Sequence, residues 1–212
     1  MIPLFHDFSG ERVLVFGGGA VGARKARRFA REAEVIVVAP EFADRDFGGA
    51  TRLRGAPDPG EVGEWLDRVD PALVVAATDD EAVNAAVETA ARDRGILVNR
   101  ADRAGERDPG SVVVPATARE DPVVVAVATG GKAPVLSGLL REDVETLIEG
   151  TGALADLLGK LRDDLDDRDV PTRKRRRALR AVAESDAVRA ALREGDPDRA
   201  REEALSVIDD AA

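Results

Sequence analysis

Three consecutive glycines follow a short apolar run near the start of the chain. The run covers residues 12–16, and the segment after it reads Gly17-Gly18-Gly19-Ala20-Val21-Gly22. This pattern is typical of a first β-strand that turns tightly into a helix starting near Ala20. Gly17 permits the turn, Gly19 lets the backbone approach a pyrophosphate, and Gly22 lets the helix pack closely on the strand. The six residues are therefore predicted to bind a dinucleotide; the alternative is a glycine-rich turn without a ligand.

The second half of this dinucleotide-binding pattern lies after the next predicted strand, at residues 34–38. An acidic residue about 20 positions beyond the glycines usually binds the ribose 2′-hydroxyl of NAD. Glu41 lies nearest to that place, just after Ala39-Pro40. It is predicted to bind the cofactor and to favour NAD over NADP, whereas Arg45 could approach a 2′-phosphate.

Strand-like and helix-like segments alternate up to about Ala101. Beyond the first strand, the pattern predicts strands at 34–38, 51–53, 72–77 and 96–98 and helices at 20–31, 58–67 and 78–94. The run at 72–77 is apolar throughout, as strands buried on both faces require. Strands that alternate with helices at this spacing indicate an α/β fold, a Rossmann-like doubly wound parallel sheet.

The alternation stops at a loop over residues 102–112. Two β-rich runs, 111–115 and 123–128, are predicted to form an antiparallel pair joined by the polar segment 117–121, followed by a helix over 135–149. From Thr151 the pattern is helical, with helix starts at Ser185 and Pro197. We expect three parts: a nucleotide-binding domain (1–112), a small mixed β/α dimerisation segment (113–150) and a C-terminal helical domain (151–212). Because so small a sheet cannot bury both faces alone, the segment predicts a homodimer.

Composition excludes several classes of protein. The formal net charge of −10 argues against nucleic acid as a partner. The chain has no cysteine, no tyrosine and one histidine, His6, so thiolate nucleophiles, disulfides and His- or Cys-rich metal sites are excluded. Acidic residues are abundant and lysine is scarce, which suggests adaptation to high salt. No apolar run approaches the roughly 20 residues of a membrane span, so a cytoplasmic protein without a membrane partner is expected.

Polar residues follow two of the predicted strands at the edge of the sheet where ligands collect in α/β folds. Thr78 and Asp79 follow strand 72–77 and are predicted to contact the cofactor, although Thr78 and Glu81 also have capping-box spacing. Asn99 and Asp102 end the next strand. Asn99 could bond the nicotinamide or its ribose, and Asp102 could accept a proton or hold a cation; an Asx-turn is the alternative for both.

Two basic features remain. Lys132 lies in a second glycine turn, Gly130-Gly131-Lys132-Ala133-Pro134, which has the geometry of an anion site or simply of a tight strand-to-helix turn. The densest basic run is Arg173-Lys174-Arg175-Arg176-Arg177. It could contact an anionic ligand, but such runs are more often solvated helix faces.

Taken in order, these motifs resemble a known family, the siroheme synthase dehydrogenase module. The matching segments are Gly17 to Lys25, Ala77-Thr78-Asp79-Asp80, Asn99 to Asp102, and Gly130-Gly131-Lys132-Ala133-Pro134-Val135-Leu136. This module is a precorrin-2 dehydrogenase, and in some members also a sirohydrochlorin ferrochelatase. The resemblance covers essentially the whole chain. It lacks the methyltransferase domain that some members carry, so a stand-alone module is expected.

The resemblance implies NAD-dependent oxidation of precorrin-2 to sirohydrochlorin by a homodimer. The family's catalytic aspartate maps onto Asp102, which is implied to accept a proton and, where chelation occurs, to assist metal insertion; iron or cobalt insertion is left open. The residues implied to bind the substrate are Arg100, Arg103, Thr129, Gly130, Gly131 and Lys132, where Thr129 replaces the family's serine. A non-catalytic NAD-sensing module and a different small NAD(P)-dependent oxidoreductase are the alternatives.

Overall fold

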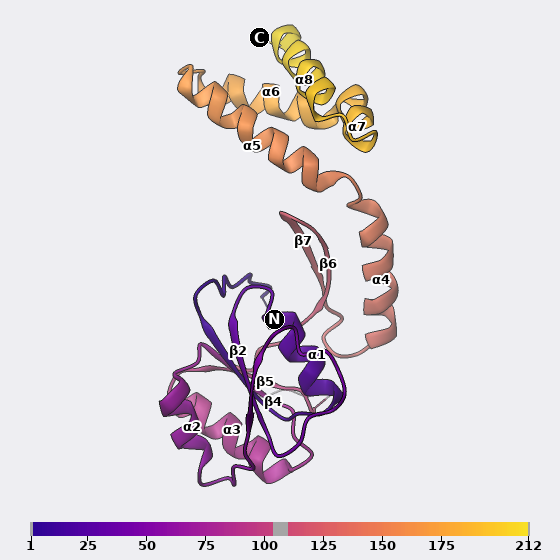
Figure 1. The fold of residues 1–212 in the computed structure, drawn as a ribbon. Coiled ribbons are helices and arrows are strands. Elements are labelled where there is room, and N and C mark those ends of the chain that lie inside the picture. Colours follow the sequence, from indigo (N-terminus) through magenta and orange to yellow (C-terminus); the bar gives the residue numbers. More distant parts are fainter. Residues whose placement is uncertain (1, 104–109, 212) are drawn as a thin grey trace. The chain divides into compact units, whose positions relative to one another are not determined.

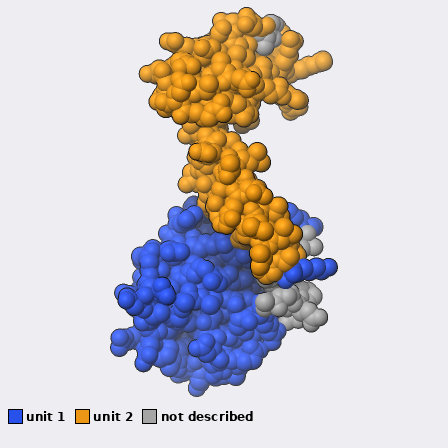
Figure 2. Space-filling view, turned by 90° about the vertical axis from the view of Figure 1, so that its right-hand side faces the viewer, with its two compact units in different colours: residues 1–114, 130–132 blue, residues 115–129, 133–212 orange. Residues whose placement is uncertain are grey.

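The computed structural model describes residues 2–103 and 110–211, and the chain divides into two compact units (Figure 2). The first unit comprises residues 1–114 and 130–132, and the second comprises 115–129 and 133–212. The middle segment and the C-terminal helices that were expected to be separate thus share a unit. The finer division at residue 150 stays a prediction.

The first unit is built on a parallel sheet in the order β3-β2-β1-β4-β5 (Figure 1). Its strands are β1 (Arg12–Phe16), β2 (Glu34–Ala39), β3 (Thr51–Arg54), β4 (Leu73–Ala76) and β5 (Leu97–Arg100). The chain adds strands to one side of β1 and then returns to add β4 and β5 on the other side. This reversal opens a crevice at the carboxyl ends of β1 and β4, where ligands bind in such sheets. The predicted doubly wound sheet is confirmed.

Helices cover both faces of the sheet: α1 (Ala20–Phe29) lies on one, and α2 (Val62–Val69) and α3 (Glu81–Asp93) lie on the other (Figure 1). Side chains of β1 alternate between the faces, as the pleat requires. Val13 and Val15 share a buried cluster with residues of α1, and Leu14 and Phe16 share one with residues of α2 and α3. The apolar runs of the sequence are therefore strands packed between two layers.

The helix predicted over residues 58–67 begins later, at Val62. The carboxylate of Asp58 accepts hydrogen bonds from the backbone N–H groups of Gly60 and Glu61, at 2.8 and 3.1 Å. These bonds hold the residues before the helix in a turn, because a short acidic side chain competes with helical hydrogen bonding. The apolar periodicity identified the helix but not where it starts.

The second unit opens with a hairpin of β6 (Ala116–Glu120) and β7 (Val123–Val127). The antiparallel pair was predicted, but its first strand was placed wrongly at 111–115. In the described part of the chain, Ser111 forms only an isolated parallel bridge with Val98. The polar segment taken as the connection is itself β6, which buries Ala118 and exposes Arg119. A strand with one solvated face needs apolar residues only at alternate positions, so polarity alone did not make it a loop.

The rest of the second unit is helical: α4 (Pro134–Leu147), α5 (Thr151–Asp167), α6 (Thr172–Glu184), α7 (Asp186–Arg193) and α8 (Pro197–Ala211). The last four enclose a leucine- and alanine-rich core. The helix starts predicted at Ser185 and Pro197 are confirmed, and the Ser185 hydroxyl accepts from the N–H of Val188 at 3.4 Å. None of the helices among the described residues is long and apolar enough to cross a membrane.

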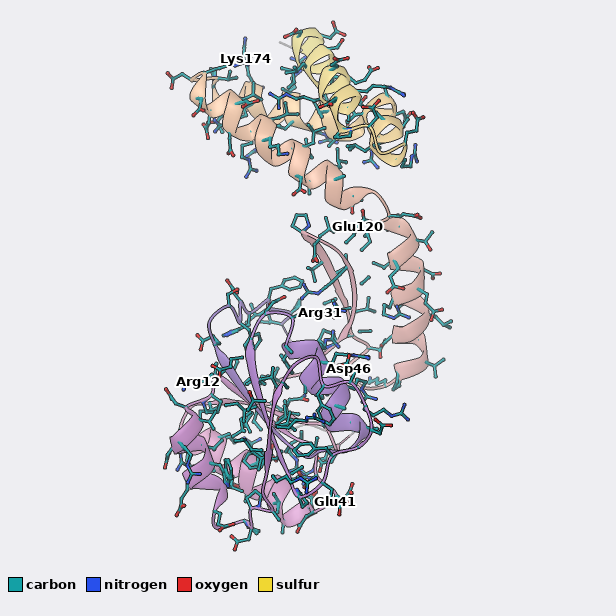
Figure 3. All side chains as sticks on the ribbon, in the orientation of Figure 1. Arg12, Arg31, Glu41, Asp46, Glu120 and Lys174 are labelled. Atoms are coloured by element: carbon teal, nitrogen blue, oxygen red, sulfur yellow. The ribbon has the colours of Figure 1, made fainter. Side chains whose placement is uncertain are left out.

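The hairpin turn and the start of α5 are in contact within this unit. The backbone N–H of Gly152 donates to the Glu120 carboxylate at 3.3 Å; Glu120 is labelled in Figure 3. A Cβ on Gly152 would come within 2.5 Å of the Asp121 carbonyl oxygen, so only glycine allows this approach.

Candidate active site

A cavity of about 800 Å³ opens in the first unit where β1, β2 and β4 end. Six of the predicted cofactor-binding residues line it: Gly17, Gly18, Gly19, Glu41, Thr78 and Asp79. Ala20, Val21 and Gly22 form the start of α1 directly behind these glycines. The exposed side chain of Glu41 is labelled in Figure 3. The structure therefore brings together three segments that lie apart in the sequence, at residues 17–19, 41 and 78–79.

Three of the glycines are required by the chain itself. Gly17 has a φ of 119°, and a Cβ there would lie 2.2 Å from the carbonyl oxygen of Ala77. A Cβ on Gly18 would lie 2.1 Å from the Glu41 carbonyl oxygen, and one on Gly22 would lie 1.9 Å from that of Gly17. Any side chain at these positions would therefore push β1, α1 and the neighbouring loops apart.

Gly19 differs, because neither conformation nor packing among the described residues requires a glycine there. Its φ is −74°, and a Cβ on it would have no described atom within 4 Å. Gly19 lines the cavity and precedes α1, whose amino-terminal N–H groups receive no side-chain cap in the described part of the chain. Uncapped N–H groups and the helix dipole attract phosphate, and a missing side chain lets phosphate come close. The residues present thus fit a dinucleotide pyrophosphate.

Asp80, rather than Thr78, caps α3. Its carboxylate accepts from the backbone N–H groups of Ala82 and Val83, at 2.8 and 3.2 Å. The predicted capping box of Thr78 and Glu81 is therefore wrong, because the aspartate two residues further on is better placed to reach the first free N–H groups. Thr78 precedes this cap, and its hydroxyl bonds to the backbone of Asp80, at 3.0 and 3.2 Å, while the residue also lines the cavity.

Asn84 is a site residue that the sequence did not reveal. It lies on α3, 1 % exposed, and its Oδ1 accepts from both the backbone N–H and the hydroxyl of Thr78, at 3.2 and 2.8 Å. Its Nδ2 donates to the Thr78 carbonyl oxygen at 2.9 Å. The available signal was an amide among the apolar positions of a helix, because a buried amide must find partners.

Asn99 does not line the cavity. Its Nδ2 donates to the carbonyl oxygen of Val112 at 2.6 Å, and Val112 returns a bond from its N–H to Val98, at 2.8 Å. The side chain is buried, and Oδ1 has no hydrogen-bond partner among the described residues. In this structure Asn99 holds Val112 against the end of β5. Its predicted bond to the nicotinamide or ribose stays a prediction.

Asp102 lies just beyond β5 in a cluster of opposite charges. Arg100 Nε and Nη2 donate to its two carboxylate oxygens, at 2.9 and 2.6 Å. The same guanidinium donates from Nη1 to Glu88 at 2.9 Å and from Nη2 to Glu81 at 2.8 Å. Arg103 donates to the other oxygen of Glu81 at 2.9 Å. These bonds tie the end of β5 to the exposed and buried sides of α3.

The cluster sets the charge of Asp102. Hydrogen bonds from the Arg100 guanidinium hold the pKa of this carboxyl below its ordinary value, against the opposing effect of burial. The same bonds raise the pKa of Arg100. Asp102 is therefore a carboxylate at neutral pH. The side chain of Arg100 is 3 % exposed and donates to three carboxylates of its own chain. Its predicted role as a substrate ligand stays a prediction.

The second glycine turn has the expected shape, with φ angles of 65° and 80° at Gly130 and Gly131. Lys132, beside them, is exposed. The hydroxyl of Thr129 lies 2.9 Å from that of Ser137 and accepts from the N–H of Ala133 at 3.3 Å. Thr129 thus closes the start of α4, as a turn former does.

The basic run lies on α6, where Lys174 is labelled in Figure 3. Arg175 pairs with Asp166 of α5, and its neighbours Arg173, Arg176 and Arg177 are exposed. This placement is that of a solvated helix face.

A parallel sheet of this order, with a glycine turn and an uncapped helix start beside a cavity at its reversal point, defines a Rossmann-type dinucleotide-binding protein. The chain belongs to the NAD(P)-binding family, whose family model matches residues 4–116. The nicotinamide dinucleotide predicted from the glycine turn is thereby confirmed as its cofactor.

The chain is also similar to curated siroheme synthases. That of Pseudomonas fluorescens (strain SBW25) is 40 % identical over 169 residues, which are 76 % of this chain and 34 % of the relative. Siroheme synthase 2 of Aeromonas hydrophila is 42 % identical over 173 residues, again 76 % of this chain and 34 % of the relative. The chain thus spans about a third of the length of these relatives. The resemblance that the motifs indicated is confirmed.

Among solved structures, "SirC, precorrin-2 dehydrogenase" aligns with a TM-score of 0.69 at 23 % identity, over 97 % of this chain and 100 % of that chain. Because the alignment covers nearly the whole chain, the residues of both units share the fold of that structure.

Proposed function

We propose that this protein oxidises precorrin-2 to sirohydrochlorin with NAD as hydride acceptor. The observation that carries the proposal is the juxtaposition of the dinucleotide cavity and the Asp102 carboxylate at one edge of the sheet. Ala76 of β4 pairs with Arg100 of β5, so the strand that leads into the cavity wall ends beside the strand that leads to Asp102. The relatives named siroheme synthase and the fold of the precorrin-2 dehydrogenase support the choice of substrate.

The cavity residues bind and orient the cofactor. The start of α1 and Gly19 receive the pyrophosphate, and Glu41 accepts a hydrogen bond from the adenosine ribose, which disfavours a 2′-phosphate and so favours NAD. Thr78 and Asp79 form the wall beside the ribose next to the nicotinamide. Bound in this way, NAD supplies the two-electron acceptor that takes a hydride from the substrate.

Asp102 accepts the proton that the reaction releases. The oxidation removes one hydrogen as hydride and a second as a proton, and an ionised carboxylate at the rim of the sheet can accept that proton. Because its pKa is low, Asp102 passes the proton to solvent rather than keeping it. The position also places a negative charge where the substrate becomes more positive as the hydride leaves.

The substrate is a polycarboxylate, and the chain offers cationic and N–H donors for it. Lys132 and the N–H groups of Gly130 and Gly131 are the donors that we assign to its carboxylates, together with Arg103. Thr129 shapes this turn. The net charge of −10 opposes capture from a distance, so binding depends on this local set and strengthens as salt screens the repulsion.

We also propose that the protein is a homodimer joined through α4 and the β6–β7 hairpin. None of the residues of α4 is buried. Ile148, which follows the helix, is buried. Its apolar side chains Val135, Leu136, Leu139 and Leu140 are exposed and recur at helical spacing on one face. An apolar face of this kind on a two-stranded hairpin and one helix is best covered by a second copy. The cytoplasmic location and the adaptation to salt stay predictions.

The test is anaerobic turnover of precorrin-2 with NAD in molar salt, with NADH and sirohydrochlorin followed together. Coupled appearance of both is expected. Tight NAD binding without turnover would overturn the proposal and favour a cofactor-sensing module. Turnover of other substrates alone would favour a different oxidoreductase.

A further inference from the structure

Arg100 is one of the few buried charged residues in the described part of the chain. Its side chain is 3 % exposed, and its guanidinium donates one hydrogen bond to Glu88, one to Glu81 and two to Asp102. Removing a cation from water costs several kcal/mol unless carboxylates surround it. Arg100 is placed where it is by the three carboxylates around it, and its removal would leave them without their shared partner.

The hydrogen bonds of Arg100 form two sets: those to Glu88 and Glu81 fix the guanidinium, and those to Asp102 orient its carboxylate. Nη1 is fixed by Glu88, whose side chain is 8 % exposed and is itself held by Arg92 at 2.8 Å. Nη2 is held from the other side by Glu81 at 2.8 Å. Nε and Nη2 donate to the two carboxylate oxygens of Asp102. A two-pronged bond of this kind fixes the direction of a carboxylate as well as its distance, which a point charge does not.

We propose that Arg100 is the positioning residue of the reaction: anchored to α3 by Glu88 and Glu81, it holds the Asp102 carboxylate in one orientation at the rim of the cofactor site. The inference rests on the proposed function, in which Asp102 serves the proton. It replaces the role of substrate ligand that the sequence suggested for Arg100. It also adds Glu88, which no motif marked, and Glu81, which the sequence suggested only for a capping box, as the residues that hold Arg100 in place.

The anchor has a second consequence for protonation. The charged groups that face Asp102 among the described residues are Arg100 itself and, beyond it, Glu81, Glu88, Arg92 and Arg103. Burial raises the pKa of Asp102, and the bonds from Arg100 outweigh that effect. If these bonds are lost, the largest cause that lowers the pKa of Asp102 is lost with them, while burial still raises it. The pKa of Asp102 is then higher than in the wild-type protein.

The experiment compares Arg100→Met and Arg100→Lys with the wild-type protein in three assays: NAD affinity by calorimetry, kcat and KM for precorrin-2, and kcat against pH. NAD affinity is expected to stay within about twofold, because Arg100 does not line the cavity. The kcat of Arg100→Met is expected to fall about tenfold to a hundredfold with little change in KM, as for a misplaced catalytic group. Its kcat should also decline on the acid side at a higher pH than that of the wild type. Arg100→Lys keeps the positive charge but cannot donate from two nitrogens to the Asp102 carboxylate. Its kcat should therefore resemble that of Arg100→Met, and its pH profile should lie between those of the wild type and Arg100→Met.

The matched control is Arg94→Met. Arg94 also donates from two nitrogens to one carboxylate, that of Asp67, at 2.7 and 3.2 Å, but this pair lies on the exposed side of α2 and α3. It should leave kcat and its pH profile unchanged. If Arg100→Met does not fold, Glu81→Gln serves instead, because Glu81 is 62 % exposed and its loss leaves Arg100 paired with Glu88. A smaller shift of the same acid limb is then expected.

The outcomes separate this inference from the proposed function. Wild-type kcat and pH profile in the folded Arg100 variants, or in Glu81→Gln where those do not fold, together with an inactive Asp102→Asn, would overturn the role of Arg100 and leave the dehydrogenase standing. Full turnover in Asp102→Asn would overturn the role of Asp102 and, with it, that of Arg100. Loss of NAD binding in the Arg100 variants would show a general structural role instead.

Discussion

Asn84 holds Thr78 by three hydrogen bonds, two of them to the backbone N–H and carbonyl of Thr78 and one to its hydroxyl. The bonds join a buried position of α3 to the wall of the cofactor cavity. They satisfy the backbone of a segment that belongs to neither β4 nor α3. The wall keeps its shape because a side chain from the next helix substitutes for the missing secondary structure.

Asn84→Ala is therefore expected to lower the free energy of unfolding by about 1–3 kcal/mol, since it removes the bonds of Asn84 to the half-buried backbone N–H and carbonyl of Thr78. NAD affinity should fall about tenfold as the wall loosens. Urea unfolding and calorimetry measure the two effects. Val87→Ala, in the same helix and equally buried, is the control: it should cost stability without a comparable loss of affinity. Equal losses of affinity in both variants would contradict the role of Asn84.

Gly19→Ala should fold as well as the wild type, because its Cβ would meet no described atom within 4 Å and its φ of −74° suits alanine. The new methyl group points into the space where the pyrophosphate approaches, so NAD affinity should fall at least about tenfold. Gly159→Ala, at an open position of α5, is the control and should leave affinity unchanged. Unchanged affinity in Gly19→Ala would remove the pyrophosphate from this turn.

Glu41→Gln should reduce the preference for NAD over NADP, because the variant no longer repels a 2′-phosphate. The ratio of the dissociation constants of the two cofactors, measured by calorimetry, should shift toward NADP by about tenfold. Glu64→Gln makes the same change of charge on the exposed side of α2, away from the cavity residues, and should leave the ratio as it is. A ratio that does not respond to Glu41 would place the ribose elsewhere.

Asp102 should make stability depend on pH in the acid range. Its pKa in the folded protein lies below the ordinary 3.8. Its contribution is therefore complete above about pH 4 and is lost as the pH falls through the folded pKa. Asp102→Asn should be destabilised by about 1–2 kcal/mol at pH 7, and the difference from the wild type should shrink below pH 4. Urea unfolding followed by the fluorescence of Trp65, the chain's single tryptophan, measures this. A constant difference down to pH 3 would contradict the ion pair.

Leu139→Glu should separate the proposed dimer, because it places a charge in the middle of the apolar face of α4. Sedimentation in molar salt should give a dimer for the wild type and a monomer for the variant. Leu53→Glu, at an exposed leucine of β3 in the other unit, should stay dimeric. A monomeric wild-type protein would sink the proposal.

The sequence was informative where the structure depends on local pattern. Apolar runs placed β1, β2, β4 and β5 to within a residue or two, because strands buried on both faces leave little choice of residue. The edge strand β3, whose residues are all exposed, was found without such a run. The glycine turn predicted one wall of the cavity, because Gly22 is required by the carbonyl oxygen of Gly17, a close neighbour in the chain. The hairpin strand β6 was missed because its apolar positions alternate with Thr117 and Arg119, and the pattern resembled a polar connection.

The arrangement around Asp102 could not be predicted in this way. Arg100 bonds to residues 12 and 19 positions before it, and those contacts exist only because α3 packs beside β5. The pattern gave the residue types at the rim but not their partners within the chain, because the bonds of Arg100 to Glu88 and Glu81 arise only from the fold. Asn84 was hidden for the same reason, because its partner Thr78 belongs to a loop.

The first turn of α3 also limits how this site can be redesigned. Asp80 lines the cavity, and the very next residue, Glu81, holds Arg100 and Arg103. A protein engineer who rebuilds the loop from Thr78 to Asp80 to admit another cofactor would shift the start of the helix and loosen the guanidinium at the rim. Under the roles proposed above for the cavity and for Arg100, a change of cofactor site also affects turnover, and such a redesign needs compensating changes on β5.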